Sequence, residues 1–339
     1  MTLTGTERGD IANTVGFSLI TGACINIVYV LLMSAPETTG LCGPDNVLMT
    51  TSPLISLMPV NYMILLAGVV SYGRPYVEAL IQRGFRMGDL KRLLLGMVIS
   101  GGSVYSQGGK YCIRFYGKDF NLHRIFADLS YSIYSTAPCS VRVNSRGTYM
   151  TQLYSKCAVS EMREFSPELN SRRGGVPTIG YILEGNIKVK AEAVRLIMSS
   201  SGWVTCSFGR AMDGVTLYPR LGLGSVLPVK LAYEYRQLAS DIAIRFDVFN
   251  DRRYPDSGYL ATSYTRDMER FRVMGGFVDG TTVKKGTFSG MDRNGLLRAL
   301  LSTKGKRFGC VTEACDYIRL MGNDTTFELK AYLDRIMLG

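Results

Sequence analysis

Cationic and aromatic side chains alternate along several segments that the sequence predicts as β-strands. Arginine contacts phosphates or guanine edges, and tyrosine stacks on unpaired bases, so this mixture is expected of a protein that binds RNA with splayed loops. An ordinary two-faced sheet with its long polar side chains in solvent would have much the same composition, and the pattern leaves that alternative open. The candidate residues are Tyr105, Lys110, Arg114, Tyr116, Lys118, Arg142, Arg146, Tyr149, Lys156, Trp203, Arg210, Tyr218, Arg220, Arg252, Arg253, Tyr254, Tyr264, Arg266 and Arg272.

The formal net charge of +11 is unevenly distributed along the 339 residues. Residues 74–339 hold 38 of the 39 Lys and Arg residues but only 24 of the 28 acidic residues. Such a surplus on a folded body indicates a polyanionic partner, most often nucleic acid, although a generic basic enzyme would share it. The pairs Arg172-Arg173 and Lys284-Lys285 lie in predicted loops, where they are either solvated or in contact with phosphates.

Metal and cofactor chemistry is poorly supplied. The eight cysteines include no CxxC pair, and His123 is the one histidine, so we expect buried free thiols, no zinc site and no cofactor. Because His123 has no nearby Cys or Ser partner in the sequence, we expect it to be structural. No Walker-type loop, GxGxxG or nucleophile elbow occurs.

The elements that must position these residues begin after an apolar extension. Residues 1–88 are predicted to be mostly helical, and both 11–36 and 46–73 are uncharged and long enough to span a bilayer. Gly, Pro and Asn interrupt both stretches, and no basic cluster flanks them. We expect residues 11–73 to pack on the rest of the chain or on a partner protein, with membrane contact as the alternative.

From residue 89 the chain shows the same α/β (α+β) order twice. The first unit, 89–170, is predicted as a helix, a hairpin turning at Gly108-Gly109, a second helix, a hairpin turning at 144–147 and a closing helix. A linker covers 171–188, and the second unit covers 189–290, with its last hairpin expected at 259–276. A helical tail, 291–339, follows. Two αββαββα units of this kind indicate an internal duplication.

Two stretches of the sequence resemble the motif region of the LAGLIDADG homing endonucleases and the related intron maturases. These are LLGMVISGGS (94–103) and VPTIGYILEGNIKVKAEAVRLIMSSSGWV (176–204). The resemblance implies a β-saddle with the two motif helices packed side by side, where small residues would allow close approach: Gly96, Ser100, Ser199 and Ser200. LAGVVSYGR (66–74) is literally closer to the family name, but a predicted helix follows it where a hairpin should stand.

The family places one carboxylate at the end of each motif helix, where the two acids bind a divalent metal and cleave a duplex. The resemblance aligns those positions with Gly101 and Ser201, which supply no carboxylate. It therefore implies that the metal site is lost and that the chain does not cleave DNA. A shifted register, or an acid arriving from Asp89, Asp213 or Asp279, is the alternative.

Three functional hypotheses follow from this resemblance. The first is a non-catalytic RNA-binding structural protein in a large ribonucleoprotein, such as an organellar ribosome. The second is an intron-splicing maturase, and the third is an active DNA homing endonuclease. The added N-terminal and C-terminal segments favour the first, since they give surface for neighbouring proteins. Structured RNA, either rRNA or intron RNA, is then the expected partner, and the expected location is an organelle, the mitochondrial matrix or its inner membrane.

Overall fold

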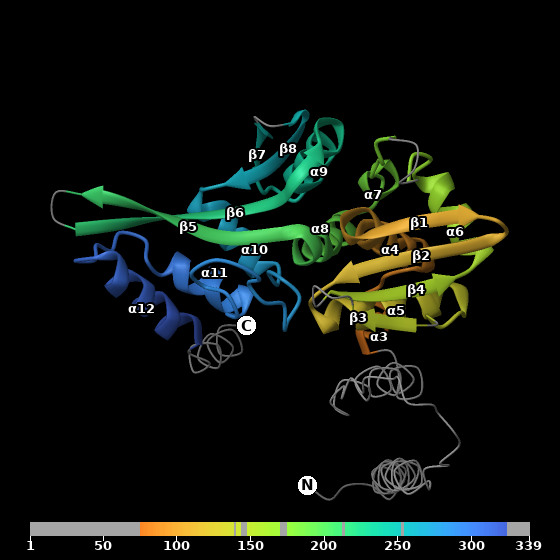
Figure 1. Ribbon diagram of the computed structural model, residues 1–339, viewed down its shortest axis with the longest axis horizontal. Helices are drawn as coiled ribbons and strands as arrows, with labels where there is room; N and C mark the ends of the chain where they lie inside the picture. The colour runs from red at the N-terminus through yellow and green to blue at the C-terminus, as the bar shows by residue number, and fades with distance from the viewer. Residues whose placement is uncertain are drawn as a thin grey trace, which may run out of the picture. The chain divides into compact units, whose positions relative to one another are not determined.

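The computed structural model describes residues 75–138, 140–143, 148–169, 175–211, 214–251 and 254–323 (Figure 1). Within them the predicted αββαββα order occurs twice, so the expected fold class is confirmed. The first unit consists of α4 (Met87–Gly101), β1 (Gly102–Gln107), β2 (Lys110–Gly117), α5 (Phe120–Tyr134), β3 (Ser140–Val143), β4 (Tyr149–Tyr154) and α6 (Lys156–Phe165).

The second unit repeats this order after the linker. It consists of α8 (Ile187–Ser201), β5 (Gly202–Ala211), β6 (Gly214–Pro228), α9 (Val229–Asp241), β7 (Asp247–Asp251), β8 (Tyr254–Thr262) and α10 (Thr265–Val273). Other helices of the described residues are α3 (Pro75–Gln82), α7 (Gly180–Leu183), α11 (Arg293–Leu301) and α12 (Val311–Asn323).

Each unit builds one antiparallel sheet, and the two sheets have equivalent strand orders. The first is β1-β2-β4-β3 and the second is β5-β6-β8-β7. The β1–β2 hairpin turns at Gly108 and Gly109, whose φ angles of 57° and 73° suit the two central positions of a tight turn. One face of each sheet packs on helices, because the alternate residues Val104, Ile113 and Leu260 are buried on it.

The motif helices α4 and α8 pack against each other. Both are apolar on most sides, since each contacts a sheet and the opposite helix; Leu93, Leu94 and Ile197 are among the residues they bury. Gly96 of α4 faces the side chain of Ile197 of α8, and a Cβ on Gly96 would lie 3.4 Å from it. The first halves of the two units thus meet through this helix pair.

The hairpin predicted at 259–276 is wrong. The hairpin lies at 247–262 as β7 and β8, and residues 265–273 form the helix α10. The helical signal was present in the sequence: Met268 and Phe271, three residues apart, are buried on one side of α10, and Asp267 stands in its first turn. The strand pattern of 247–251 was obscured by its charged and polar ends.

Several predictions lie outside the described residues. They concern residues 1–74, including the apolar stretches 11–36 and 46–73, the turn at 144–147, and the last predicted helix at 325–337. Among the described helices, none has the length and apolarity needed to cross a membrane. The five segment boundaries stay predictions.

Candidate nucleic-acid interface

The C-terminal ends of α4 and α8 meet at the positions where the family resemblance expects two acids. A Cβ on Gly101 would overlap the hydroxyl of Ser200 and lie 3.0 Å from the buried ring of Phe115. The neighbouring motif helix therefore fills the space that a side chain at position 101 would need. An aspartate there, which would be required to rebuild a metal site, does not fit unless the Ser200 hydroxyl and the Phe115 ring move.

The glycines that follow both helices are also enclosed. A Cβ on Gly102 would lie 2.6 Å from the carbonyl oxygen of Arg114, and one on Gly202 would lie 2.9 Å from Cα of Met198. After each of these helices, the backbone enters a strand directly and stays in van der Waals contact with the last turn of the helix. The two ends are therefore built alike, as the internal duplication requires.

A buried arginine covers the end of α8. Arg293 is 7% exposed, and its Nη1 donates hydrogen bonds to the carbonyl oxygens of Met198 (3.3 Å), Ser199 (2.9 Å) and Gly202 (3.1 Å). The carbonyl of Met198 also accepts from the backbone N–H of Gly202, and the guanidinium charge complements the negative end of the helix dipole. The hydroxyl of Ser201 is turned back toward the carbonyl of Ile197 at 3.3 Å.

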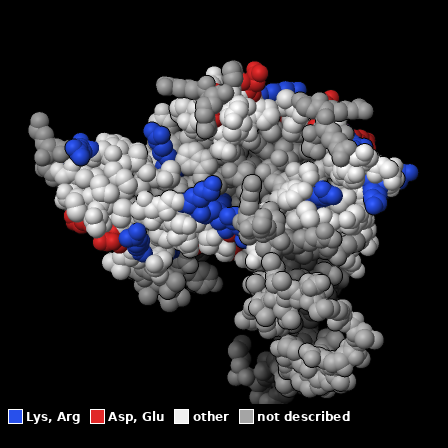
Figure 2. Space-filling model, viewed as in Figure 1, with Lys and Arg blue, Asp and Glu red and all other residues white. Residues whose placement is uncertain are grey.

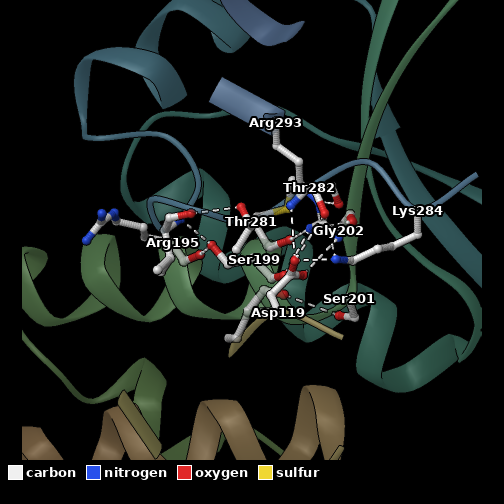
Figure 3. Close-up of polar contacts among 12 residues, drawn as sticks. Asp119, Arg195, Ser199, Ser201, Gly202, Thr281, Thr282, Lys284 and Arg293 are labelled. Carbon is white, nitrogen blue, oxygen red and sulfur yellow. Dashed lines mark hydrogen bonds and ion pairs between the residues drawn. The ribbon is translucent and has the colours of Figure 1, made fainter. Parts of the chain in front are cut away.

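Asp119 of the first unit completes this arrangement (Figure 3). It is 6% exposed, and its carboxylate pairs with Lys284 and lies 4.0 Å from Arg293. It also accepts a hydrogen bond from the backbone N–H of Thr282 at 3.1 Å. Burial lowers the pKa of Arg293, while the nearby Asp119 opposes that shift. The group therefore joins one carboxylate of the first unit to two cations that follow the second.

This cation-rich cluster is unsuited to a divalent metal, because its one carboxylate already has two cationic partners. The described residues contain no group of three His, Cys, Asp or Glu side chains that could hold a metal ion. Asp89 accepts from the N–H of Arg86 at the opposite end of α4, and Asp279 is exposed beside Asn294. Asp213 lies outside the described residues.

The outer face of the first sheet, opposite its helices, gathers several predicted binding residues. Register places Tyr105 across from Cys112, Arg114 across from Ser103 and Gln152, and Arg142 across from Met150. The Arg114 guanidinium lies 5.3 Å from the centroid of the Tyr105 ring. The residues of this face that were predicted from the sequence are Tyr105, Lys110, Arg114, Tyr116 and Arg142.

Other predicted residues lie elsewhere. Tyr149 is on the helix side of the sheet, with its ring centroid 5.9 Å from that of His123, because β4 pairs it with Gly117. Lys156 begins α6, and Arg210 is paired with Val215, which register places on the helix side. Tyr264, Arg266 and Arg272 belong to α10 or its cap rather than to a strand. Lys284 is in the buried cluster, while Lys118 and Lys285 are exposed; Arg146, Arg172, Arg173, Arg252 and Arg253 lie outside the described residues.

The four small residues predicted for the helix contact have different surroundings. Gly96 lies against α8, and Ser200 lies against Gly101. The hydroxyl of Ser199 donates to the carbonyl of Arg195 and accepts from the N–H of Val278, so it holds the segment after α10. The hydroxyl of Ser100 bonds within its own helix, to Met97.

The second sheet's outer face holds Trp203, Tyr218 and Arg220, and two aromatic residues that sequence analysis missed, Phe249 and Tyr259. Phe249 was missed because the hairpin was placed too late in the chain. Asp119 and Arg293 were missed because nothing in their local sequence connects positions so far apart.

Lys and Arg side chains are spread over the side of the molecule seen in Figure 2 and gather near its middle.

Comparisons with known proteins give structural neighbours only. Neither a protein-family model nor a curated protein sequence matches the chain. One neighbour is a structure of mesophilic variants of the homing endonuclease I-DmoI. The two chains are 16% identical, the match covers 55% of this chain and 90% of that one, and the TM-score is 0.40. Another is full-length DUF199/WhiA from Thermatoga maritima, with 13% identity, coverage of 69% of this chain and 66% of that one, and a TM-score of 0.40. The N-terminal LAGLIDADG domain of DUF199/WhiA has 13% identity, 57% and 84% coverage, and a TM-score of 0.39. The solved structures that this chain resembles are LAGLIDADG proteins, the family whose motifs residues 94–103 and 176–204 resemble.

Proposed function

We propose that this chain binds structured RNA without cleaving it, as a structural component of a large ribonucleoprotein such as an organellar ribosome. The observation that carries the proposal is the packing at the motif-helix ends. A side chain at Gly101 would have to displace the Ser200 hydroxyl and press on the Phe115 ring, and the end of α8 is capped by Arg293. A protein built in this way keeps the helix pair as a structural spine and has replaced metal chemistry there with packing.

Support for nucleic-acid binding comes from the first sheet's outer face. Strands β1, β2 and β4 carry Lys110 and Arg114 there and no acidic residue. A face that carries only positive charge, beside exposed tyrosines, suits a phosphate backbone with accessible bases.

Neighbouring proteins, or a membrane, are the proposed partners of residues 11–73, and the proposed location is a mitochondrion.

The test is a native purification of the full chain from its source cells without nuclease. The product is sedimented through sucrose, and the accompanying nucleic acid is sequenced. We expect rRNA in a ribosome-sized particle. A small particle carrying one intron would instead indicate a maturase. Recovery of DNA alone, together with Mg²⁺-dependent cleavage of that DNA by the purified chain, would overturn the proposal.

A further inference from the structure

Three aromatic rings form a row across the outer face of the second sheet. Tyr259 of β8 stacks on Phe249 of β7, with centroids 5.3 Å apart and an angle of 15° between the ring planes. Trp203 of β5 is next along the row, 6.4 Å from Tyr259. Since the strand order is β5-β6-β8-β7, the row runs across the strands and passes over β6.

A glycine in β6 allows the indole to lie against that strand. Trp203 is paired with Gly222, and a Cβ on Gly222 would overlap the six-membered ring of the indole. The indole Nε1 donates to the carbonyl of Gly224 at 2.9 Å, which fixes the ring in this position. The same device recurs beside the row, where a Cβ on Gly209 would lie 2.5 Å from the ring of Tyr218.

The rings of the row keep some of their surface accessible. Phe249 is 43% exposed, and Trp203 and Tyr259 are partly exposed, whereas large apolar side chains on the helix side of the sheet are buried. Burying aromatic surface is favourable, so a row of fixed, partly exposed rings is a surface where flat partners gain binding energy at little entropic cost.

The two outer faces differ in charge. On the first sheet, strands β1, β2 and β4 present Lys110 and Arg114 with no acid, whereas the second sheet presents Arg220 together with the exposed acid Asp247. A phosphate backbone is attracted by the first arrangement and gains little from the second. Flat, weakly charged groups suit the second, and unpaired nucleobases attached to a phosphate backbone combine both requirements.

We infer that the row Trp203–Tyr259–Phe249 is a stacking platform for unpaired bases of RNA, while the first sheet's outer face contacts the phosphates. This inference rests on the proposed RNA-binding function and specifies its substrate class. The preferred RNA is a stem with an adjoining loop of unpaired nucleotides, and an uninterrupted duplex binds through the first face alone.

The experiment uses the full chain, whose one tryptophan is Trp203. An RNA stem with an eight-nucleotide loop is compared with a continuous RNA duplex of equal length and charge, by fluorescence and by affinity. We expect the loop RNA to quench the tryptophan emission and to bind about tenfold more tightly, as expected for stacking of one to two bases. Equal affinity without quenching would overturn the inference and leave the proposed function standing. Failure of both RNAs to bind would overturn the proposed function itself.

Variants then locate the effect. Phe249→Ala should remove most of the difference in affinity between the loop RNA and the duplex, and should leave duplex binding unchanged. Phe249→Tyr, which keeps an aromatic ring, should retain the tighter binding of the loop RNA. Tyr233→Ala is the matched control, because Tyr233 is 53% exposed but lies on α9. An equal loss from both alanine variants would contradict the platform. If Phe249→Ala does not fold, the quenching measured on the unaltered chain decides alone.

Discussion

At the scale of a single residue, Gly101 shows how packing at the helix ends excludes a side chain. We expect Gly101→Ala to lower the free energy of unfolding by about 1–3 kcal/mol, because its Cβ would press on the Phe115 ring and displace the Ser200 hydroxyl. Urea denaturation measures the change. The control is Gly88→Ala in the same helix, whose Cβ would make an ordinary 3.5 Å contact with Arg92. That variant should be unchanged or more stable, since alanine is the better helix former. Equal destabilisation by both would contradict the packing argument.

His123 makes stability depend on pH below neutrality. It is fully buried, its Nδ1 lies 2.7 Å from the hydroxyl of Thr151, and burial lowers its pKa to about 4. Between this value and the unfolded value of about 6.5, the unfolded chain binds more protons. Stability is therefore complete above about pH 6.5 and is lost as the pH falls toward 4.

The expected loss from His123 is roughly 2 kcal/mol between pH 7 and pH 5. Urea denaturation at both pH values, in the unaltered chain and in His123→Phe, measures it. The variant cannot take up this proton, so its stability should change much less over the same interval. An identical change in both proteins would show that another group is responsible.

At the scale of elements, Arg293 connects α11 to the end of α8 and to Asp119 at the start of α5. We expect Arg293→Met to lower the free energy of unfolding by about 3–5 kcal/mol, because three carbonyls and one carboxylate lose a buried cationic partner. Urea denaturation at constant pH measures this. The matched control is Arg319→Met, whose ion pair with Asp316 is half exposed or more, and it should cost less than about 1 kcal/mol. If Arg293→Met lowered the free energy of unfolding by no more than the control does, the cap on α8 would contribute little to stability.

Local pattern predicted most of these elements. The motif helices, expected at 89–101 and 189–201, each begin two residues earlier, and the Gly108-Gly109 turn lies where it was expected. The one misplaced hairpin fell in 247–276, where short polar strands and a charged helix offer weak periodicity. The first sheet's outer face could also be predicted, because strand alternation assigns faces once the turn is fixed.

At the scale of the whole molecule, the charge surplus of 74–339 predicts salt-dependent binding. Affinity for structured RNA should fall by at least about tenfold between 50 and 200 mM salt, because phosphate contacts release counterions. Lys110→Ala on the first outer face should reduce the slope of log affinity against log salt by about one, whereas Lys230→Ala on α9 should not. A flat salt response would contradict the electrostatic part of the proposal.

The cluster at the helix ends could not be predicted from the sequence. Asp119 and Arg293 are 174 positions apart in the printed sequence, and each stands in locally unremarkable surroundings. Only the packing of α11 near the end of α8 brings them together. For the same reason the aromatic row was seen in part: Trp203 was a candidate, but its neighbours Tyr259 and Phe249 depend on strand order.

The pairing of Asp119 with Lys284 also orders events during synthesis of the chain. A ribosome releases the first unit well before residues 282–293 leave its exit tunnel. Until then Asp119 has neither of its two cations nor the N–H of Thr282. The buried carboxylate of Asp119 therefore gains these partners only after residues 282–293 have been translated.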